Sequence, residues 1–433
     1  MPAWSIIGRG ALVVSLAVPA AAAAQTPAPA PAPGPPAARI SMADAVRLAV
    51  EHNHQLRAQR LNVDISRADE ITAALKPNPT LTSTNENFPV FAPSQLFNSD
   101  NFLNNQNFVE SLTYLFERGG KRRNRTIVAQ DTTDVAAKTA FDAERQLRFD
   151  TEQAFINVLL AKSSLELAQE DLKNFQEVLD VNKERLRVGD LAEADFYKIS
   201  LQMLQFQQDE SSAEVALVQA KAALRQSVGF DALAAQFDVD GDLGYTKQTV
   251  TLDDLMAAAI ATRPDLLAAQ SGVKLAQDTQ ALAYSNRARD VVGGVEYDRA
   301  GPLNAVGFSI SVDLPFHDRN QGNIAHSKVA LTQAQELQAQ ADSTVRTDVL
   351  TAFSTLQANE RVLSLYQTGY LDQAKQSLDI TTYVYQHGNG TLLDLLDAER
   401  TYRSTQLAYR QALAAYMTSV QQVNFVVGKQ VMQ

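Results

Sequence analysis

Two aspartates, Asp394 and Asp397, have a spacing that points to a shared role. They lie three residues apart at the start of a predicted helix, so their carboxylates project from nearly the same face. Carboxylates in the first turn of a helix are stabilised by the exposed backbone amides and by the helix dipole, which makes capping the simplest interpretation. A ring of such carboxylates from several copies of the chain would instead attract cations and repel anions. The sequence leaves both interpretations open.

Motifs of nucleotide binding, metal binding and nucleophilic catalysis are incomplete. Gly120-Lys121 lies between a strand and a helix, but a phosphate loop needs an earlier glycine and a Ser or Thr where Leu115 and Arg122 stand. His52 and His54 are two residues apart in a helical segment, so they face different directions. The other histidines have no partner four residues away, and no serine-hydrolase motif is present: His317, His326 and His387. We therefore predict no enzyme, no cofactor and no bound metal.

Composition and charge restrict the class of protein. The chain has 433 residues, of which 45% are apolar but only 7% aromatic, as expected for an alanine-rich helical protein. The formal net charge is −11, and loss of an export signal containing Arg9 would lower it by one more. This balance argues against a nucleic-acid partner, which requires a basic stripe. The absence of cysteine excludes disulfides, thiolate sites and an N-terminal lipid anchor on cysteine.

The N-terminal region is predicted to be an export signal followed by a tether. Residues 1–24 contain Arg9, an apolar run and a small-residue cleavage site before Gln25, which is the pattern of a signal peptide. The alternative, a membrane anchor, is disfavoured because the run is shorter than the roughly 20 residues of a spanning helix. Residues 25–38 form a Pro/Ala-rich linker, which cannot support helix or sheet hydrogen bonding.

An internal repeat organises the remainder of the chain. At a shift of 210 residues the segment from Ile40 to Leu56 matches the segment from Val250 to Leu266. At a shift of 199 residues, three further pairs match at the ends of the two halves: Gly189 with Gly388, Asp195 with Asp394, and Gly229 with Gly428. We therefore expect two structural repeats, over 39–237 and 238–433.

Each repeat is predicted to contain two strands, at about 79–91 and 107–116 in the first and about 290–299 and 304–314 in the second. The last of these alternates regularly between apolar and small or polar residues, so one face requires apolar surroundings. Strands of about ten residues with such a face suit a membrane β-barrel. Four strands are too few to close a barrel, so several copies must share one. Two hairpins in a soluble sheet are the alternative.

Each repeat also contains two long helices, at about 118–186 and 192–228 and at about 319–386 and 391–427. The third has no proline and only two glycines, Gly322 and Gly369, and would reach ~100 Å if uninterrupted. The fourth keeps a seven-residue row of large side chains, which favours helices supercoiled side by side: Leu395, Tyr402, Tyr409, Tyr416 and Val423. Two such antiparallel hairpins would form a wall or a tube.

Over Ile40 to Gly428 the chain resembles the TolC-type outer-membrane efflux proteins. The resemblance is carried by the duplicated helix openings, the two glycine turns and the run from Leu392 to Arg400. It implies a mainly α fold with a membrane β-barrel, in which a homotrimer closes one twelve-stranded barrel and a twelve-helix periplasmic tunnel. It also implies that the chain lies in the outer membrane, in contact with its lipid.

The resemblance assigns roles to three groups of residues. The two hairpin tips would dock a periplasmic adaptor bound to an inner-membrane RND-type pump: Arg187, Val188, Gly189, Asp190 and Leu191 in the first, and Gly388, Asn389, Gly390 and Thr391 in the second. Asp394, Asp397 and Tyr385 match residues that line or close the periplasmic constriction. Separation of the hairpins by the adaptor would open it.

Two stretches resemble the heavy-metal (cobalt-zinc-cadmium type) branch of this family, Arg118 to Arg122 and Asp313 to Ile324. We therefore expect a passive exit duct for metal cations in a tripartite efflux pump. The alternatives are a drug or protein-secretion duct of the same family, a periplasmic coiled-coil scaffold, and a secreted enzyme with helical arms. Many family members carry a lipid-accepting cysteine that this chain lacks, so its membrane attachment would rest on the barrel alone.

Overall fold

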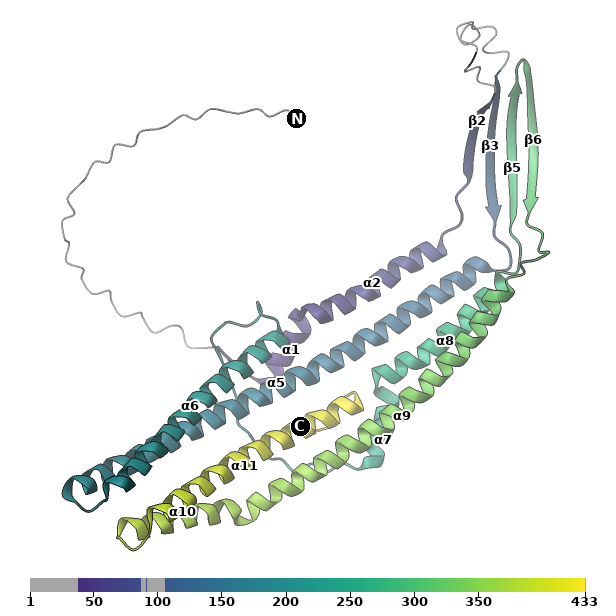
Figure 1. Cartoon of the computed structure of the whole chain (residues 1–433). Helices are drawn as coiled ribbons and strands as arrows, with labels where there is room; N and C mark the ends of the chain where they lie inside the picture. Colours follow the sequence, from purple (N-terminus) through teal and green to yellow (C-terminus); the bar gives the residue numbers. More distant parts are fainter. Residues whose placement is uncertain (1–37, 87–90, 92–105, 433) are drawn as a thin grey trace, which may run out of the picture. The chain divides into compact units, whose positions relative to one another are not determined.

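Two successive parts of the chain repeat one order of elements: two helices, two strands and a long helical hairpin (Figure 1). The computed structural model describes residues 38–86, 91 and 106–432. The first part comprises α1 (Met42–His52), α2 (His54–Ala74), β2 (Thr80–Glu86), β3 (Asn107–Phe116), α5 (Lys121–Val188) and α6 (Glu193–Val228). The second part comprises α7 (Leu252–Thr262), α8 (Pro264–Ser285), β5 (Val291–Ala300), β6 (Leu303–Val312), α9 (Gln321–Leu365), α10 (Leu371–Gln386) and α11 (Leu392–Val427).

The first helix of each part begins with the same cap. The side chain of Ser41 accepts a hydrogen bond from the backbone N–H of Asp44, and Thr251 accepts the equivalent bond from Asp254. Such caps satisfy one of the backbone donors left free at a helix start. A short parallel pair, β1 (Ala38–Ile40) with β4 (Phe237–Val239), joins the start of the first part to the segment that follows α6.

The four longer strands form one antiparallel sheet in the order β2-β3-β5-β6. The register places Leu112 opposite Val295, and Val295 opposite Phe308, so these side chains share one face. Phe308 is 84% exposed and Ile310, on the same face, is 83% exposed. The opposite face carries Ser111, Glu296 and Gly307 in one row. The sheet therefore presents a solvent-exposed apolar face and a polar face.

The two helical hairpins bury their side chains in separate layers along their length. Near the turns, a cluster of Phe175, Ile199, Met203 and Phe206 joins α5 to α6, and Leu392 and Leu396 of α11 pack against it. The rings of Phe175 and Phe206 stack with centroids 4.5 Å apart. A larger cluster lies between α7, α9 and α11. The seven-residue row of α11 supplies Leu395, Tyr416 and Val423 as buried residues.

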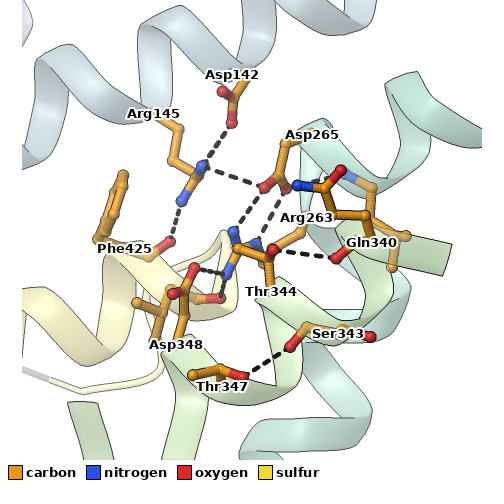
Figure 2. A network of polar contacts seen from close by, with 12 residues as sticks. Asp142, Arg145, Arg263, Asp265, Gln340, Ser343, Thr344, Thr347, Asp348 and Phe425 are labelled. Carbon is orange, nitrogen blue, oxygen red and sulfur yellow. Dashed lines mark hydrogen bonds and ion pairs between the residues drawn. The ribbon is translucent and has the colours of Figure 1, made fainter. Parts of the chain in front are cut away.

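A partly buried ion-pair network connects the start of α8 with α5, α9 and α11 (Figure 2). Arg263, whose side chain is 3% exposed, forms two parallel hydrogen bonds to Asp265 and one to Asp348 on α9. Arg145 of α5 lies 4.0 Å from the same Asp265 and donates to the backbone oxygen of Phe425. Paired arginine–carboxylate forks of this kind fix orientation as well as distance.

The long helix predicted over about 319–386 is divided in the structure. Between α9 and α10, Tyr366–Tyr370 forms a π-helical turn in which Gly369 has φ 117°. Only glycine adopts this conformation without a steric penalty, and an extra residue in the turn rotates every side chain that follows. The helix also begins at Gln321 rather than at 319, after Asn320 at φ 61°.

Other boundaries shift by a few residues. The strand predicted over 304–314 is observed as Leu303–Val312, and Pro315 follows shortly after its end. The helix predicted from 118 begins at Lys121, because Gly119 and Gly120 both have positive φ. The predicted signal peptide (1–24) and the linker up to residue 37 lie outside the described residues. The strand predicted over 79–91 is observed as Thr80–Glu86, and residues 87–90 and 92–105 also lie outside the described residues. None of the described helices is long and apolar enough to span a membrane.

Candidate constriction and hairpin tips

The two hairpin tips end α5 and α10 with the same hydrogen-bond pattern. The N–H of Gly189 donates to Leu186 O at 3.1 Å, and the next N–H reaches back to Arg185 O at 2.8 Å. In the second hairpin, the N–H of Gly388 donates to Tyr385 O at 3.0 Å, and that of Asn389 to Val384 O at 3.0 Å. Both glycines are left-handed, with φ 86° and 74°. These are Schellman turns, in which glycine ends the helix without strain.

The tip residues predicted from the sequence are mostly exposed. In the first tip, Arg187, Val188, Gly189 and Asp190 are exposed, and Leu191 is half-buried against the Phe175 cluster. Arg187 forms an ion pair with Glu184 on its own helix. In the second tip, Gly388, Asn389 and Thr391 are exposed, and Gly390 is half-buried. A Cβ atom on Gly390 would lie 3.1 Å from the backbone nitrogen of Tyr385, so this glycine allows a close approach of turn and helix.

Asp394 caps α11. The side chain of Thr391 accepts a hydrogen bond from the backbone N–H of Asp394, and the Asp394 carboxylate accepts from the Thr391 hydroxyl at 2.6 Å. The Asp394 carboxylate also accepts from the Thr391 backbone N–H at 3.4 Å, which completes a capping box. α6 has no side-chain cap at the corresponding residue, Ala192. The capping interpretation therefore describes the contacts of Asp394 within one chain.

Asp397 lies one turn further along α11, beside Arg400. Their charged groups are 2.8 Å apart, and the two side chains are 62% and 75% exposed. Exposed pairs three residues apart on a helix contribute little to stability. Both predicted constriction acids are thus accessible on the first two turns of α11, and neither is buried by its own chain.

Tyr385 connects the two hairpins. Its ring is 7% exposed, and its hydroxyl donates to Oδ1 of Asn182 on α5 at 2.7 Å. The side-chain amide of Asn182, itself 1% exposed, donates to Val178 O at 2.8 Å and is thereby held in position. The guanidinium of Arg185 lies 5.2 Å from the ring centre of Tyr385, within cation–π range. Burial raises the pKa of Tyr385, so its hydroxyl stays protonated and able to donate.

A second connection between the hairpins lies about five helical turns from the tip of α5. Arg403 of α11 is 2.8 Å from Asp209 of α6, and its guanidinium lies 4.7 Å from the ring centre of Phe206. A cavity of about 330 Å³ adjoins these residues and is also lined by Asp171 of α5. Burial raises the pKa of Asp171 to about 6, and burial likewise raises the pKa of Glu399 to about 6.

Asn182, Asp209 and Arg403 were not identified from the sequence. Each lies in the middle of a long helix, where a polar residue has no motif around it. Their partners are distant in the chain, and Asn182 and Tyr385 have a sequence separation of 203. Only the packing of one hairpin on the other brings them together.

The histidines and acidic side chains form no metal centre within the described ranges. No group of three or more His, Asp or Glu side chains there is arranged to hold a metal ion. His387, next to the second tip, shares a hydrogen bond between its Nδ1 and Tyr383 O at 2.8 Å. Gly120 and Lys121 start α5, and the Lys121 amine forms an ion pair with Asp290 at 2.8 Å instead of facing a phosphate loop.

Comparison with known proteins places this geometry in context. The family described as "Outer membrane efflux protein" matches residues 45–230 and 255–429. The cobalt-zinc-cadmium resistance protein CzcC of Cupriavidus metallidurans is 21% identical over 91% of both chains. A membrane protein from Pseudomonas aeruginosa has a TM-score of 0.76 at 17% identity, covering 91% of both chains. The MtrE outer membrane channel of Neisseria gonorrhoeae, in its open state, has a TM-score of 0.74 at 18% identity, covering 90% of this chain and 89% of MtrE.

Proposed function

Because the chain belongs to the outer membrane efflux protein family, we propose that it forms the exit duct of a tripartite pump that expels metal cations. One observation carries this proposal. A four-stranded sheet with an exposed apolar face continues directly into two long helical hairpins. The sheet suits the lipid of the outer membrane, and the hairpins suit a duct that crosses the periplasm.

We infer that three copies of the chain build the duct, as the family resemblance implies. In the described residues, β2 and β6 each pair on one side only, which leaves two strand edges with free backbone groups. An unpaired edge is costly in lipid, where no water can satisfy those groups. Pairing of β6 with β2 of a neighbouring copy removes both edges, and three copies of four strands give a closed barrel of twelve.

The periplasmic end of this duct is proposed to be gated by Tyr385, Asp394 and Asp397. Threefold symmetry brings six exposed carboxylates to one ring, where they would attract cations and hold multivalent ions. The bond from Tyr385 to Asn182 holds the second hairpin against the first, so it favours the closed arrangement. An adaptor that separates the hairpins must break this bond and the contact of Arg403 with Asp209.

The two tips are proposed as the docking surface for that adaptor, which would couple the duct to an inner-membrane pump. Both Schellman turns present backbone and small residues at the surface, and Val188 (59% exposed) and Leu393 (75% exposed) add apolar area beside them. The repeated geometry gives each chain two similar docking points.

Metal cations are the proposed cargo because the relative CzcC is a cobalt-zinc-cadmium resistance protein. The stretches Arg118 to Arg122 and Asp313 to Ile324 support the same branch of the family. The alternative cargo is a drug or a secreted protein.

Growth assays distinguish these cargoes. A strain lacking the gene is tested on zinc, cadmium, cobalt and copper salts and on a drug panel, with and without the gene restored from a plasmid. We expect metal sensitivity that the plasmid reverses. Sensitivity to drugs alone would contradict the metal proposal and leave the channel proposal standing.

A further inference from the structure

A basic groove lies where the sheet joins the helices of the first part. The groove has a volume of about 920 Å³ and lies between the end of α2, the end of β3 and the start of α5. Four cationic side chains line it: Lys76, Lys121, Arg122 and Arg123. This is unusual in a chain of net charge −11, since residues 118–125 hold five cations and no acid.

Most of this charge is not neutralised by the protein. Lys121 is paired with Asp290, and the neighbouring Arg125 is paired with Glu117 at 2.7 Å. Lys76, Arg122 and Arg123 are exposed and form no ion pair with any described residue. Three free cations around one groove create a positive potential that a neutral or cationic ligand would not balance.

The rest of the lining is mostly aromatic and apolar, apart from Thr126 and Glu117, and the Glu117 carboxylate is already paired with Arg125. Tyr114 and Phe116 of β3 line it, with ring centroids 4.9 Å apart in an edge-to-face arrangement. Both project from the same strand face as Leu112, which belongs to the exposed apolar face of the sheet. The groove thus continues from a cationic rim onto the surface that is proposed to face lipid. Its ligand must carry an anion and a long apolar part in the same molecule.

We propose that this groove binds the headgroup of an anionic phospholipid in the periplasmic leaflet of the outer membrane. The inference rests on the proposed function, which places the sheet in that membrane and the helices in the periplasm. The lipid phosphate lies between Lys76, Arg122 and Arg123, and the acyl chains lie along Tyr114, Phe116 and the apolar face of the sheet. Aromatic rings are favoured at this interfacial depth, and each Lys or Arg near an anionic surface strengthens binding. The bound lipid would fix the depth of the sheet in a chain that has no cysteine for lipid attachment.

Native mass spectrometry of the purified full-length protein tests this inference. The protein is incubated with phosphatidylglycerol, with cardiolipin or with zwitterionic phosphatidylethanolamine, and the lipids retained per chain are counted. The test variant is Lys76→Gln/Arg122→Gln/Arg123→Gln. The matched control removes three exposed cations that form no ion pair within the described part of the chain and lie away from the groove: Arg57→Gln/Lys247→Gln/Arg361→Gln.

We expect the wild type and the control to retain anionic lipid, and the test variant to bind it about 10- to 100-fold more weakly. Equal retention by the test variant and the control would overturn the proposal, as would equal binding of the zwitterionic lipid. Displacement of the lipid by excess inorganic phosphate would also overturn it, because the site would then recognise a free anion. If the groove instead binds a second copy of the chain, the test variant would lose the oligomer but retain the lipid, which would also contradict the proposal.

Conductance in planar bilayers separates this inference from the proposed function. The test variant is expected to conduct like the wild type, because none of its three substitutions lies in the proposed constriction. A wild type that binds anionic lipid but does not conduct would contradict the channel and leave the lipid site standing. A wild type that conducts but shows no preference for anionic lipid would contradict the lipid site and leave the channel proposal standing.

Discussion

The hydroxyl of Tyr385 donates a 2.7 Å hydrogen bond to Oδ1 of Asn182, a residue 203 positions earlier in the sequence. This bond joins the two helical hairpins. Both side chains are almost fully buried. If a buried acceptor loses its hydrogen-bond donor, the free energy of removing that acceptor from water is no longer compensated. The pair is therefore suited to hold the tips together in one state and to release them in another.

Replacement of Tyr385 by Phe is expected to weaken the closed state of the duct. It leaves Oδ1 of Asn182 unsatisfied at a cost of about 1–3 kcal/mol, and each 1.4 kcal/mol changes an equilibrium tenfold. We expect a higher mean conductance in planar bilayers, with the sheet and the helices intact by circular dichroism. The matched control is Tyr383→Phe, since Tyr383 is 61% exposed on the same helix. Equal conductance of the two variants would contradict a holding role for Tyr385.

The proposed acid ring predicts a change in ion selectivity. Because Asp394 also caps α11, the substitution used is Asp394→Asn with Asp397→Asn, which keeps a side chain able to cap. We expect the double variant to lose cation preference and block by trivalent metal ions in planar bilayers. Asp372→Asn with Asp379→Asn removes two exposed acids of α10 as a control and should preserve both properties. Unchanged selectivity in the first variant would refute the ring.

The helices and strands could be predicted from the spacing of apolar residues and glycines along the chain, because the same residues determine the packing in the folded structure. The alternation ending at Val312 places Phe308 and Ile310 on one face, and both are exposed on that face in the structure. Gly189 and Gly388 were predicted as turns because a positive φ is needed where one helix ends, and both have it. In these places a few neighbouring residues determine the geometry.

The contacts between hairpins could not be predicted in this way. The contact between Asn182 and Tyr385 depends on how two long helices are rotated about their axes, and one extra residue in a helical turn changes that rotation. The π-helical turn Tyr366–Tyr370 introduces such a change, and Tyr370 at its end is 57% exposed. A single glycine inside a helix costs only about 1 kcal/mol, so its presence did not predict the interruption.

The half-buried acids Asp171 and Glu399 predict that the contact between the hairpins is pH-dependent. Burial raises the pKa of each carboxyl to about 6, above the unfolded value. The folded state therefore binds more protons than the unfolded state between about pH 4 and 7, so the free energy of unfolding falls as the pH rises through this window.

We expect thermal unfolding to occur at a higher temperature at pH 5.5 than at pH 7.5. The variant Asp171→Asn with Glu399→Gln should lose part of this difference, by roughly 1 kcal/mol per site after solvent screening. Glu152, whose pKa is raised by burial to about 7, still titrates in the same window in this variant. Asp372→Asn with Asp379→Asn serves as the control. Equal pH dependence of the test variant and the wild type would contradict the role of the two half-buried acids.

Arg263 is expected to be a principal determinant of stability. Its replacement by Met leaves the half-buried carboxylates of Asp265 and Asp348 without their main partner, which should cost about 1–3 kcal/mol. Urea unfolding monitored by circular dichroism measures this loss. Arg346→Met breaks an exposed pair with Asp342 on α9 and should change stability little. Equal effects of the two substitutions would show that the network in Figure 2 is not a special support of the fold.

Electrophoretic migration of the protein from isolated outer membranes tests the central claim most directly. Membranes of the native host are fractionated, and the chain is detected without heating and after boiling in detergent. If three chains close one barrel, the unheated protein from the outer-membrane fraction migrates as a trimer, and boiling converts it to a single chain. Recovery of the chain from the soluble periplasmic fraction, with the same single-chain migration before and after boiling, would contradict the account.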